Sequence, residues 1–468
     1  MLANIDYLIV IVYLVSVMGL GLYASRGIKN LNQYAVAGRD YTAPVVFATL
    51  SAAFIGGGFT LGNAEKVFMW GIVNIFALWG FSFKEILVAK YIAPRMQAHR
   101  DAISIGDIMV KAYGKPGRLV SGICGVLLCI GIIGAQVGAM GYVFETFLNI
   151  SRIWGIILGC GTLIVYVTLG GIRAVVITEI LQFVILALGL PLALVFAVIH
   201  AGGVESVLAR IPVDHLTIPG AHLSWVAFIS LFLTFMLGET LVPPYLQRLL
   251  IGKDIHHIAR GTLWSGLFSI PFFAITGCLG LVALAMQPDL DPNLAVPYLV
   301  KTALPVGIVG IVIASIICVV MSSAESFLNA ASVAFTNDIV KPLMKKPLEA
   351  SQELRIAKIF TLFCGIGAVI MAVKVASVID ILIYAYHFWA PMMVVPLVAA
   401  IFGFRTSTKV YLTSVICGFV SMWVWQYGLN NPYGLEGLVV GVIMNIVSLY
   451  VAQKCWGNEV SPVLEESV

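Results

Sequence analysis

Apolar segments of about twenty residues follow one another along the whole chain, and they constrain the fold more than any other feature. A helix of about 20 apolar residues spans the hydrocarbon core of a bilayer and satisfies its own backbone hydrogen bonds there. Only 11 % of the 468 residues are charged, against about 25 % in a typical soluble domain. The sequence therefore predicts an all-α, polytopic membrane protein.

Cutting the apolar runs at the polar gaps between them predicts thirteen transmembrane helices. The predicted spans are residues 5–24, 42–62, 70–92, 119–147, 153–170, 174–199, 224–247, 262–286, 303–327, 356–373, 376–402, 408–427 and 434–453. Most of the 27 Lys and Arg residues fall into alternate loops between these spans. Because cytoplasmic loops carry the basic excess, we expect an outside N-terminus and a cytoplasmic C-terminus. The expected location is a plasma membrane or bacterial inner membrane, and the net charge of +4 gives no indication of a nucleic-acid partner.

Two predicted spans contain residues that interrupt helices. Span 2 carries three successive glycines at 56–58, and span 7 carries Pro243 and Pro244, which lack a backbone donor. Paired breaks in two halves of a membrane protein mark a transporter's binding site. The breaks lie five spans apart, which predicts two inverted five-helix repeats. The predicted domains are residues 1–41 (first helix and its loop), 42–199 (spans 2–6), 200–402 (spans 7–11) and 403–468 (two helices and a tail).

A column of polar residues lies in predicted span 9. Val319, Ser322, Ser323 and Ser326 are spaced to share one face of a helix. Hydroxyl oxygens and backbone carbonyls released by a broken helix are hard ligands, suited to an alkali cation. The alternative is structural, because serine hydroxyls also bond neighbouring helices and small residues allow close packing. Together with the glycine-broken span, the column favours an ion site.

Several motifs in this chain resemble the sodium:solute symporter family. MSSAES with the downstream NDIVKPL is similar to the family's signature, and further matching segments are GGGFTLGNAEKVFMWG, LGGIRAVVITEILQ and PPYLQRLL. The resemblance runs from about residue 26 to residue 427. It implies a secondary transporter with thirteen spans and a LeuT-type 5+5 inverted-repeat core. Sodium is the implied coupling ion.

The resemblance also implies ligands for that ion. In the family, the main sodium site joins two backbone carbonyls of the broken second span to a carbonyl and two hydroxyls of span 9. The matching positions of this sequence are Ala52 and Ile55 in span 2 and Val319, Ser322 and Ser323 in span 9.

Some members of the family hold a second cation further in, and this chain departs from their pattern. Glu179 stands at the aspartate position of span 6, Glu325 replaces a serine, and Ser326 is retained. The two carboxylates would hold a second sodium or share a proton. An ionisable group within a membrane is costly, and it is interpreted as functional by default. The alternative is that Glu325 reaches the cytoplasmic interface and is solvated.

The solute pocket is predicted from the two broken spans and from the segment YAYHFWAP in span 11. Its candidate residues, for each of which packing is the alternative, are Phe54, Gly57, Phe59, Gln136, Glu239, Val242, Tyr384, His387 and Trp389. Among branches of the family, the motifs look most like choline transporters, which hold a quaternary ammonium in an aromatic cage. Here the cage is incomplete, because Phe54 and Val242 stand at two of its tryptophan positions.

Lys84 and Glu85 are charged residues in the middle of predicted span 3. Because adjacent residues do not face each other on a helix, each is expected to need a different partner. Either they pair with charges on neighbouring spans, or Lys84 meets an anionic group of the solute.

The sequence thus predicts sodium-coupled symport of a small polar organic solute by alternating access. One alternative is a proton-coupled symporter of the same fold that uses Glu179 and Glu325. Another is a membrane-embedded sensor with a separate partner chain. No HExxH, GxSxG or P-loop motif is present, so we expect no enzyme. The expected partners are the solute, sodium and the bilayer, with no required protein partner.

Overall fold

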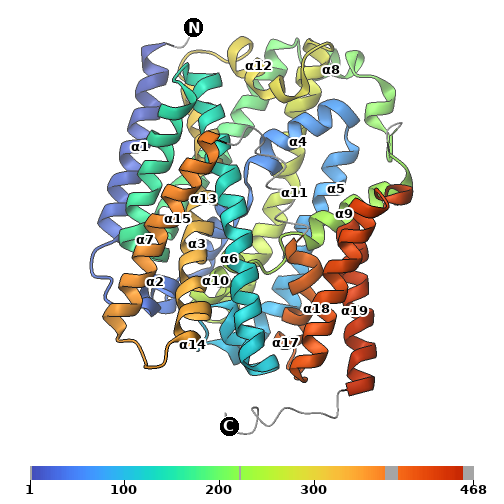
Figure 1. Ribbon diagram of the computed structural model, residues 1–468. Coiled ribbons are helices and arrows are strands. Elements are labelled where there is room, and N and C mark those ends of the chain that lie inside the picture. The colour runs from blue at the N-terminus through green and yellow to red at the C-terminus, as the bar shows by residue number, and fades with distance from the viewer. Residues whose placement is uncertain (1–2, 221–222, 375–387, 457–468) are drawn as a thin grey trace.

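The chain is helical throughout the part that the structure describes. The computed structural model describes residues 3–220, 223–374 and 388–456. Within these ranges the only β pairing is one isolated bridge between Tyr41 and Gly252. Helix α1 (Asn4–Ala24) begins at the top of Figure 1, and α19 (Gly437–Trp456) ends at the bottom. The described chain therefore starts and finishes at opposite ends of the helical bundle.

The other α-helices surround a central helix, α13. Their bounds are α2 Leu31–Val36, α3 Ala43–Phe54, α4 Gly57–Trp70, α5 Val73–Leu87, α6 Ile105–Leu148, α7 Arg152–His200, α8 Val204–Arg210, α9 Trp225–Leu237, α10 Pro243–Ile251, α11 Ile255–Met286, α12 Ala295–Thr302, α13 Ile308–Ala334, α14 Lys341–Leu343, α15 Ala350–Lys374, α17 Val395–Ile401 and α18 Thr408–Trp423. Short 3₁₀ or π segments are η1 Ala37–Arg39, η2 Val88–Ile92, η3 Ala93–His99, η4 Val213–Leu216, η5 Pro292–Leu294, η6 Phe335–Val340, η7 Ala390–Val394, η8 Val424–Gly428 and η9 Pro432–Gly434.

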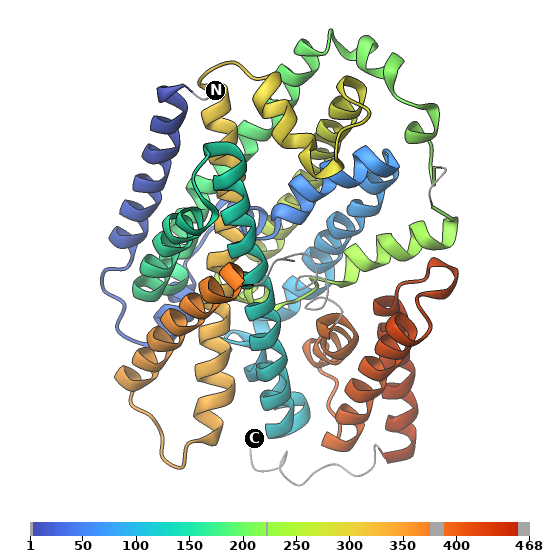
Figure 2. The same ribbon diagram turned by 45° about the horizontal axis from the view of Figure 1, so that its top comes forward.

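Long apolar helices dominate the bundle. In the described ranges, seven helices are long and apolar enough to cross a membrane, and the bent pair α3–α4 raises the number to eight. Predicted spans 153–170 and 174–199 both fall within α7, whose helical backbone is interrupted at Gly171 (φ 54°, ψ −146°). Figure 2 shows α18 and α19 side by side at one edge of the bundle and α1 at the opposite edge.

Helix α13 is the centre of the bundle. It packs against α1, α3, α6 and α7, and 89 % of its most apolar stretch is buried. The predicted span ended at residue 327, but α13 continues to Ala334. The alternative of a solvated Glu325 at the interface is wrong, because this side chain is fully buried. The sequence prediction stopped before Asn329 and Ser332, whereas both residues are buried inside the bundle.

Two stretches beside α13 leave the helical conformation. Helix α3 ends at Phe54 and α4 begins at Gly57, with a bend of 55° between them. After α9, the chain passes through Leu241 at a positive φ of 54° before α10 begins. Pro243 and Pro244 occupy the first turn of α10, where the missing amide costs no helical hydrogen bond. The prolines therefore start a helix rather than kink one.

Candidate functional site

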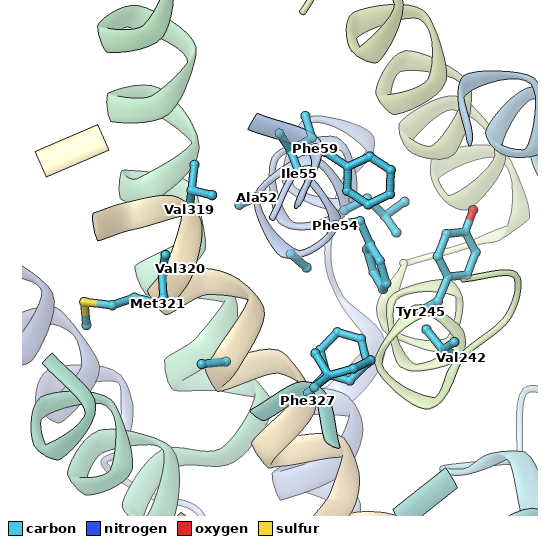
Figure 3. Close-up of a cluster of buried hydrophobic side chains, with 14 of the residues drawn as sticks. Ala52, Phe54, Ile55, Phe59, Val242, Tyr245, Val319, Val320, Met321 and Phe327 are labelled. Carbon is cyan, nitrogen blue, oxygen red and sulfur yellow. The ribbon is translucent and has the colours of Figure 1, made fainter. Parts of the chain in front are cut away.

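The end of α3 meets the polar face of α13. Because α3 stops at Phe54, the carbonyls of its last turn have no helical amide to accept from. Ser322 Oγ donates to the Ala52 carbonyl at 2.7 Å, and Ser323 Oγ donates to the Ala53 carbonyl at 2.9 Å. All four residues are buried, and Figure 3 shows Ala52 and Ile55 next to Val319. The predicted sodium ligands of span 2 and span 9 thus lie together.

Gly56 permits this close contact between the two elements. A Cβ added at Gly56 would lie 2.9 Å from Ser323 Oγ, which is inside the contact distance of real atoms. A Cβ added at Gly58, two residues further on, would meet nothing within 4 Å. Only one of these two glycines is thus required by the approach of α13.

The oxygen atoms at this junction fit a hard cation such as sodium. They are hydroxyls and backbone carbonyls, and no cluster of three or more His, Cys, Asp or Glu side chains suited to a metal occurs within residues 3–220, 223–374 and 388–456. The Ala53 carbonyl was missed by the sequence reasoning. Its place follows from the last turn of α3, where the helix leaves carbonyls without partners, and no residue pattern signals it.

Glu179 and Ser326, two of the residues predicted for a second cation, are in contact in the structure. Ser326 and Thr49 each donate a hydrogen bond to the Glu179 carboxylate. Nη2 of Arg248 lies 2.7 Å from Glu179 Oε1 and also bonds to the Ser326 hydroxyl. The guanidinium of Arg248 therefore contacts both of these predicted ligands.

Because predicted span 7 ends at residue 247, the sequence places Arg248 among the basic residues of the following cytoplasmic loop, and that assignment is wrong. Its side chain is fully buried inside the bundle. Its guanidinium also donates to the Pro244 carbonyl at 3.2 Å. The signal that could have located it is its spacing in PPYLQR. Four residues after Pro244, it lies on the same face of the helix, within reach of the carbonyl of that first turn.

Glu325 belongs to a different set of contacts. Tyr166 donates a hydrogen bond to its carboxylate, and Thr178 Oγ1 lies 3.1 Å from Oε2 and 3.2 Å from Oε1. Glu179 and Glu325 thus have different hydroxyl partners, and the guanidinium of Arg248 pairs with Glu179. Both carboxylates are fully buried.

A cavity of about 680 Å³ lies beside the junction of α3 and α13, towards the end of the bundle where α1 begins (Figure 1). Gly57, Gln136 and Val320 line its inner part. Its outer part is lined by Glu145 and Asp291, which are exposed to solvent. The cavity therefore connects the interrupted helix with one face of the protein.

Two of the candidate solute residues line this cavity, namely Gly57 and Gln136. The others that the structure describes do not. Phe54 packs edge-on against Tyr245 with 5.2 Å between ring centroids, and Phe59 stacks on Phe273 at 5.5 Å. Val242, Glu239 and Trp389 are buried within the protein, where Trp389 Nε1 donates to the Thr240 carbonyl at 3.0 Å. Tyr384 and His387 lie outside the described residues.

Lys84 and Glu85 pair with each other, so the expectation of separate partners is wrong. Lys84 Nζ lies 2.8 Å from Glu85 Oε1, and Tyr245 donates to Glu85 Oε2 at 2.9 Å. The ammonium also lies 3.9 Å from the centroid of the Phe81 ring and 4.3 Å from that of Tyr245. The long lysine stem lets the ammonium bend back to its neighbour, which spacing along a helix does not reveal.

The helical bundle, the interrupted helix and the adjoining cavity define a transporter of the polytopic membrane class. The chain belongs to the sodium:solute symporter family, and the sequence model of that family matches residues 34–418. It is 23 % identical over 455 residues to the osmoregulated proline transporter of Bacillus subtilis (strain 168), covering 93 % of this chain and 92 % of that one. It is 25 % identical over 498 residues to sodium/glucose cotransporter 4 of Mus musculus, covering 95 % and 68 %.

The fold is similar to that of solved cation-coupled transporters. A Na⁺-coupled sialic acid symporter, solved in a substrate-bound outward-open state, aligns with a TM-score of 0.84 at 20 % identity, covering 96 % of this chain and 98 % of that one. Mhp1, a nucleobase-cation-symport-1 family transporter, aligns with a TM-score of 0.60 at 13 % identity, covering 92 % and 97 %.

These likenesses confirm the expected family, its transporter rather than enzyme character and a LeuT-like helical fold. The choline branch is not confirmed, since the relatives named here are proline and glucose transporters. The thirteen spans, the two inverted repeats and the predicted ligands stay predictions.

Proposed function

We propose that this protein is a sodium-coupled symporter of a small polar organic solute that works by alternating access. The observation that carries the proposal is the junction at which two serine hydroxyls of α13 meet two carbonyls at the end of α3. This junction lies beside a cavity that contains Gly57 and Gln136. Ion and solute would therefore bind close together.

Sodium would bind the carbonyl of Ala52 and the hydroxyls of Ser322 and Ser323, with the Ile55 and Val319 carbonyls as further ligands. A serine hydroxyl has two lone pairs and can rotate its hydrogen away, so its oxygen can bind a cation. Because this ion would join α3 to α13, it would stabilise the arrangement in which the cavity faces the N-terminal side. Solute binding at Gly57 and Gln136 would then precede closure of that side. The membrane potential supplies about 2.3 kcal/mol per charge per 100 mV for the inward step.

The proposed topology has thirteen spans, an outside N-terminus, a cytoplasmic C-terminus and inverted repeats with interrupted spans 2 and 7. Support comes from the opposite positions of the start of α1 and the end of α19 (Figure 1), which require an odd number of crossings. Further support comes from the two non-helical stretches at 55–56 and 238–242 beside α13.

The buried ion pair favours one sodium per cycle over two. A second sodium at Glu179 and Ser326 would have to displace the guanidinium of Arg248.

Proton coupling is the second candidate function, and it is favoured by the wholly buried Glu325 with its hydroxyl partners Tyr166 and Thr178. Replacing Glu325 by Gln separates the candidates. Loss of pH-dependent uptake would support proton coupling, and uptake that keeps its sodium and pH dependence would contradict it.

The test of the proposed function is thermal unfolding of the purified protein with amino acids, carboxylates, sugars and quaternary amines, each in sodium and in potassium. A ligand that binds the folded state raises the Tm with its concentration. We expect sodium to raise the Tm and the combined Ser322→Ala, Ser323→Ala variant to weaken sodium binding by about tenfold or more.

Ser332→Ala is the matched control. Ser332 is a buried serine of the same helix, but its hydroxyl donates to the Asn329 carbonyl one turn before it, at 2.8 Å. We expect this variant to keep the sodium effect. An equal loss in both variants, or no sodium effect in the unmodified protein, would contradict the proposed function.

A further inference from the structure

A second cavity lies at the end of the bundle opposite the first one. Its volume is about 660 Å³, and it is formed by η3, the first turns of α6 and the segment that follows α17. In Figure 1 this region lies at the bottom, around the label of α17. Neither the proposed sodium site nor the proposed solute site uses it.

The cavity is positively charged. Arg95, Lys111 and Arg405 all line it, and all three side chains are exposed. Among the residues that the structure describes, the one carboxylate in an ion pair with these cations is Asp101, 2.6 Å from Lys111 Nζ. A net positive charge therefore remains within the cavity, and it comes from three different elements of the fold.

His99 adds a buried polar atom to the same wall. The side chain is 8 % exposed, and its Nδ1 has no hydrogen-bond partner within the described part of the chain. Buried polar atoms are normally paired, so an atom of this kind at a cavity is available to a ligand. Burial, and then the charge of Lys111, lowers the pKa of His99 below its ordinary value. A bound anion would oppose that shift.

The rim of the cavity is aromatic and apolar. Phe402 lines the cavity and is 48 % exposed, although its ring lies among charged residues. The guanidinium of Arg95 stacks on the Phe402 ring at 3.8 Å from its centroid. The site thus combines exposed cations with an exposed aromatic ring.

We propose that this cavity binds the phosphate headgroup of an anionic phospholipid. Arg95, Arg405 and Lys111 would hold the phosphate oxygens, and the exposed Phe402 ring would lie along the first part of the acyl chains. Arginine pairs with phosphate through charge-assisted hydrogen bonds, and basic pockets between membrane helices bind such headgroups. Inorganic phosphate shares the charge chemistry, but the exposed Phe402 ring at the cavity matches only the lipid. The proposal is independent of the sodium and solute sites.

The test compares three additives in thermal unfolding of the full chain: short-chain phosphatidylglycerol, phosphatidylcholine of equal chain length and inorganic phosphate. We expect phosphatidylglycerol alone to raise the Tm in a saturable manner. The Arg95→Gln, Arg405→Gln variant should shift the half-saturating lipid concentration upwards by about tenfold. Arg260→Gln is the control, because Arg260 is an exposed arginine at the start of α11 that does not line the cavity.

Three outcomes would overturn the proposal. The first is an equal effect of phosphatidylcholine, which would show that the acyl chains alone bind. The second is a full shift with inorganic phosphate, which would show a free-anion site. The third is an equal loss in Arg260→Gln, which would show a response to surface charge. Should the double variant fail to fold, Lys111→Gln provides the same comparison with one charge removed.

Discussion

Arg248 shows how a single residue changes the electrostatics of the interior. Its guanidinium and the Glu179 carboxylate are both completely buried and lie 2.7 Å apart. Removing one partner of a buried pair typically costs about 3–5 kcal/mol, because the remaining charge loses its compensation. The pair is thus strongly coupled even though its net contribution to stability is small.

We predict that Arg248→Met lowers the Tm markedly and that a second change, Glu179→Gln, restores much of the loss. The reason is that the double variant leaves no uncompensated charge in the interior. Thermal unfolding of the single and double variants forms a double-mutant cycle that measures the coupling. Additive losses in the two single variants would show that the residues act independently.

The serines of α13 and the ion pair at Arg248 differ in how far the sequence predicts them. Ser322 and Ser323 follow from helical spacing and hydroxyl chemistry, and the structure places both against α3. Arg248 and the Lys84–Glu85 pair do not follow, because long side chains reach partners that spacing along one helix does not specify. Partner choice for such residues is a property of the packed bundle.

At the scale of elements, the junction of α3 and α13 depends on one missing side chain. We predict that Gly56→Ala weakens sodium binding and lowers stability by about 1–3 kcal/mol, because the added Cβ would overlap Ser323 Oγ. Gly58→Ala should have little effect, since its Cβ would meet nothing within 4 Å. Thermal unfolding in sodium and in potassium measures both effects. Equal behaviour of the two variants would argue against a close junction.

Element boundaries were less predictable than element positions. The apolar pattern located the helices, yet α13 continues past the predicted end at residue 327 to Ala334, and this last part of the helix is buried in the bundle. Span 7 was predicted to be interrupted at Pro243 and Pro244, whereas the non-helical residues are 238–242 and the prolines occupy the first turn of the next helix. In both cases the tertiary environment decides where a helix stops, and hydropathy does not contain that information.

The whole molecule has two ends that can be distinguished chemically. Cys455, close to the end of α19, is the exposed cysteine within the described ranges, where the other seven are buried or partly buried. For the proposed topology, we predict that a membrane-impermeant maleimide added to intact cells leaves Cys455 unmodified. The same reagent should modify it after permeabilisation, as mass analysis of the purified chain would show. Modification of Cys455 in intact cells would reverse the proposed orientation.

Alternating access predicts that sodium changes the exposure of the cavity beside α4. Leu61 lines this cavity, so Leu61→Cys in a Cys455→Ser background places a thiol in it. Because sodium would hold α3 against α13 while the cavity faces the N-terminal side, we expect an external maleimide to react severalfold faster in sodium than in potassium. Adding Ser322→Ala and Ser323→Ala should abolish that difference. Equal reaction rates in sodium and in potassium would show that ion binding at the junction does not control the exposure of the cavity. Reaction only from the opposite side of the membrane would contradict the proposed direction in which the cavity opens.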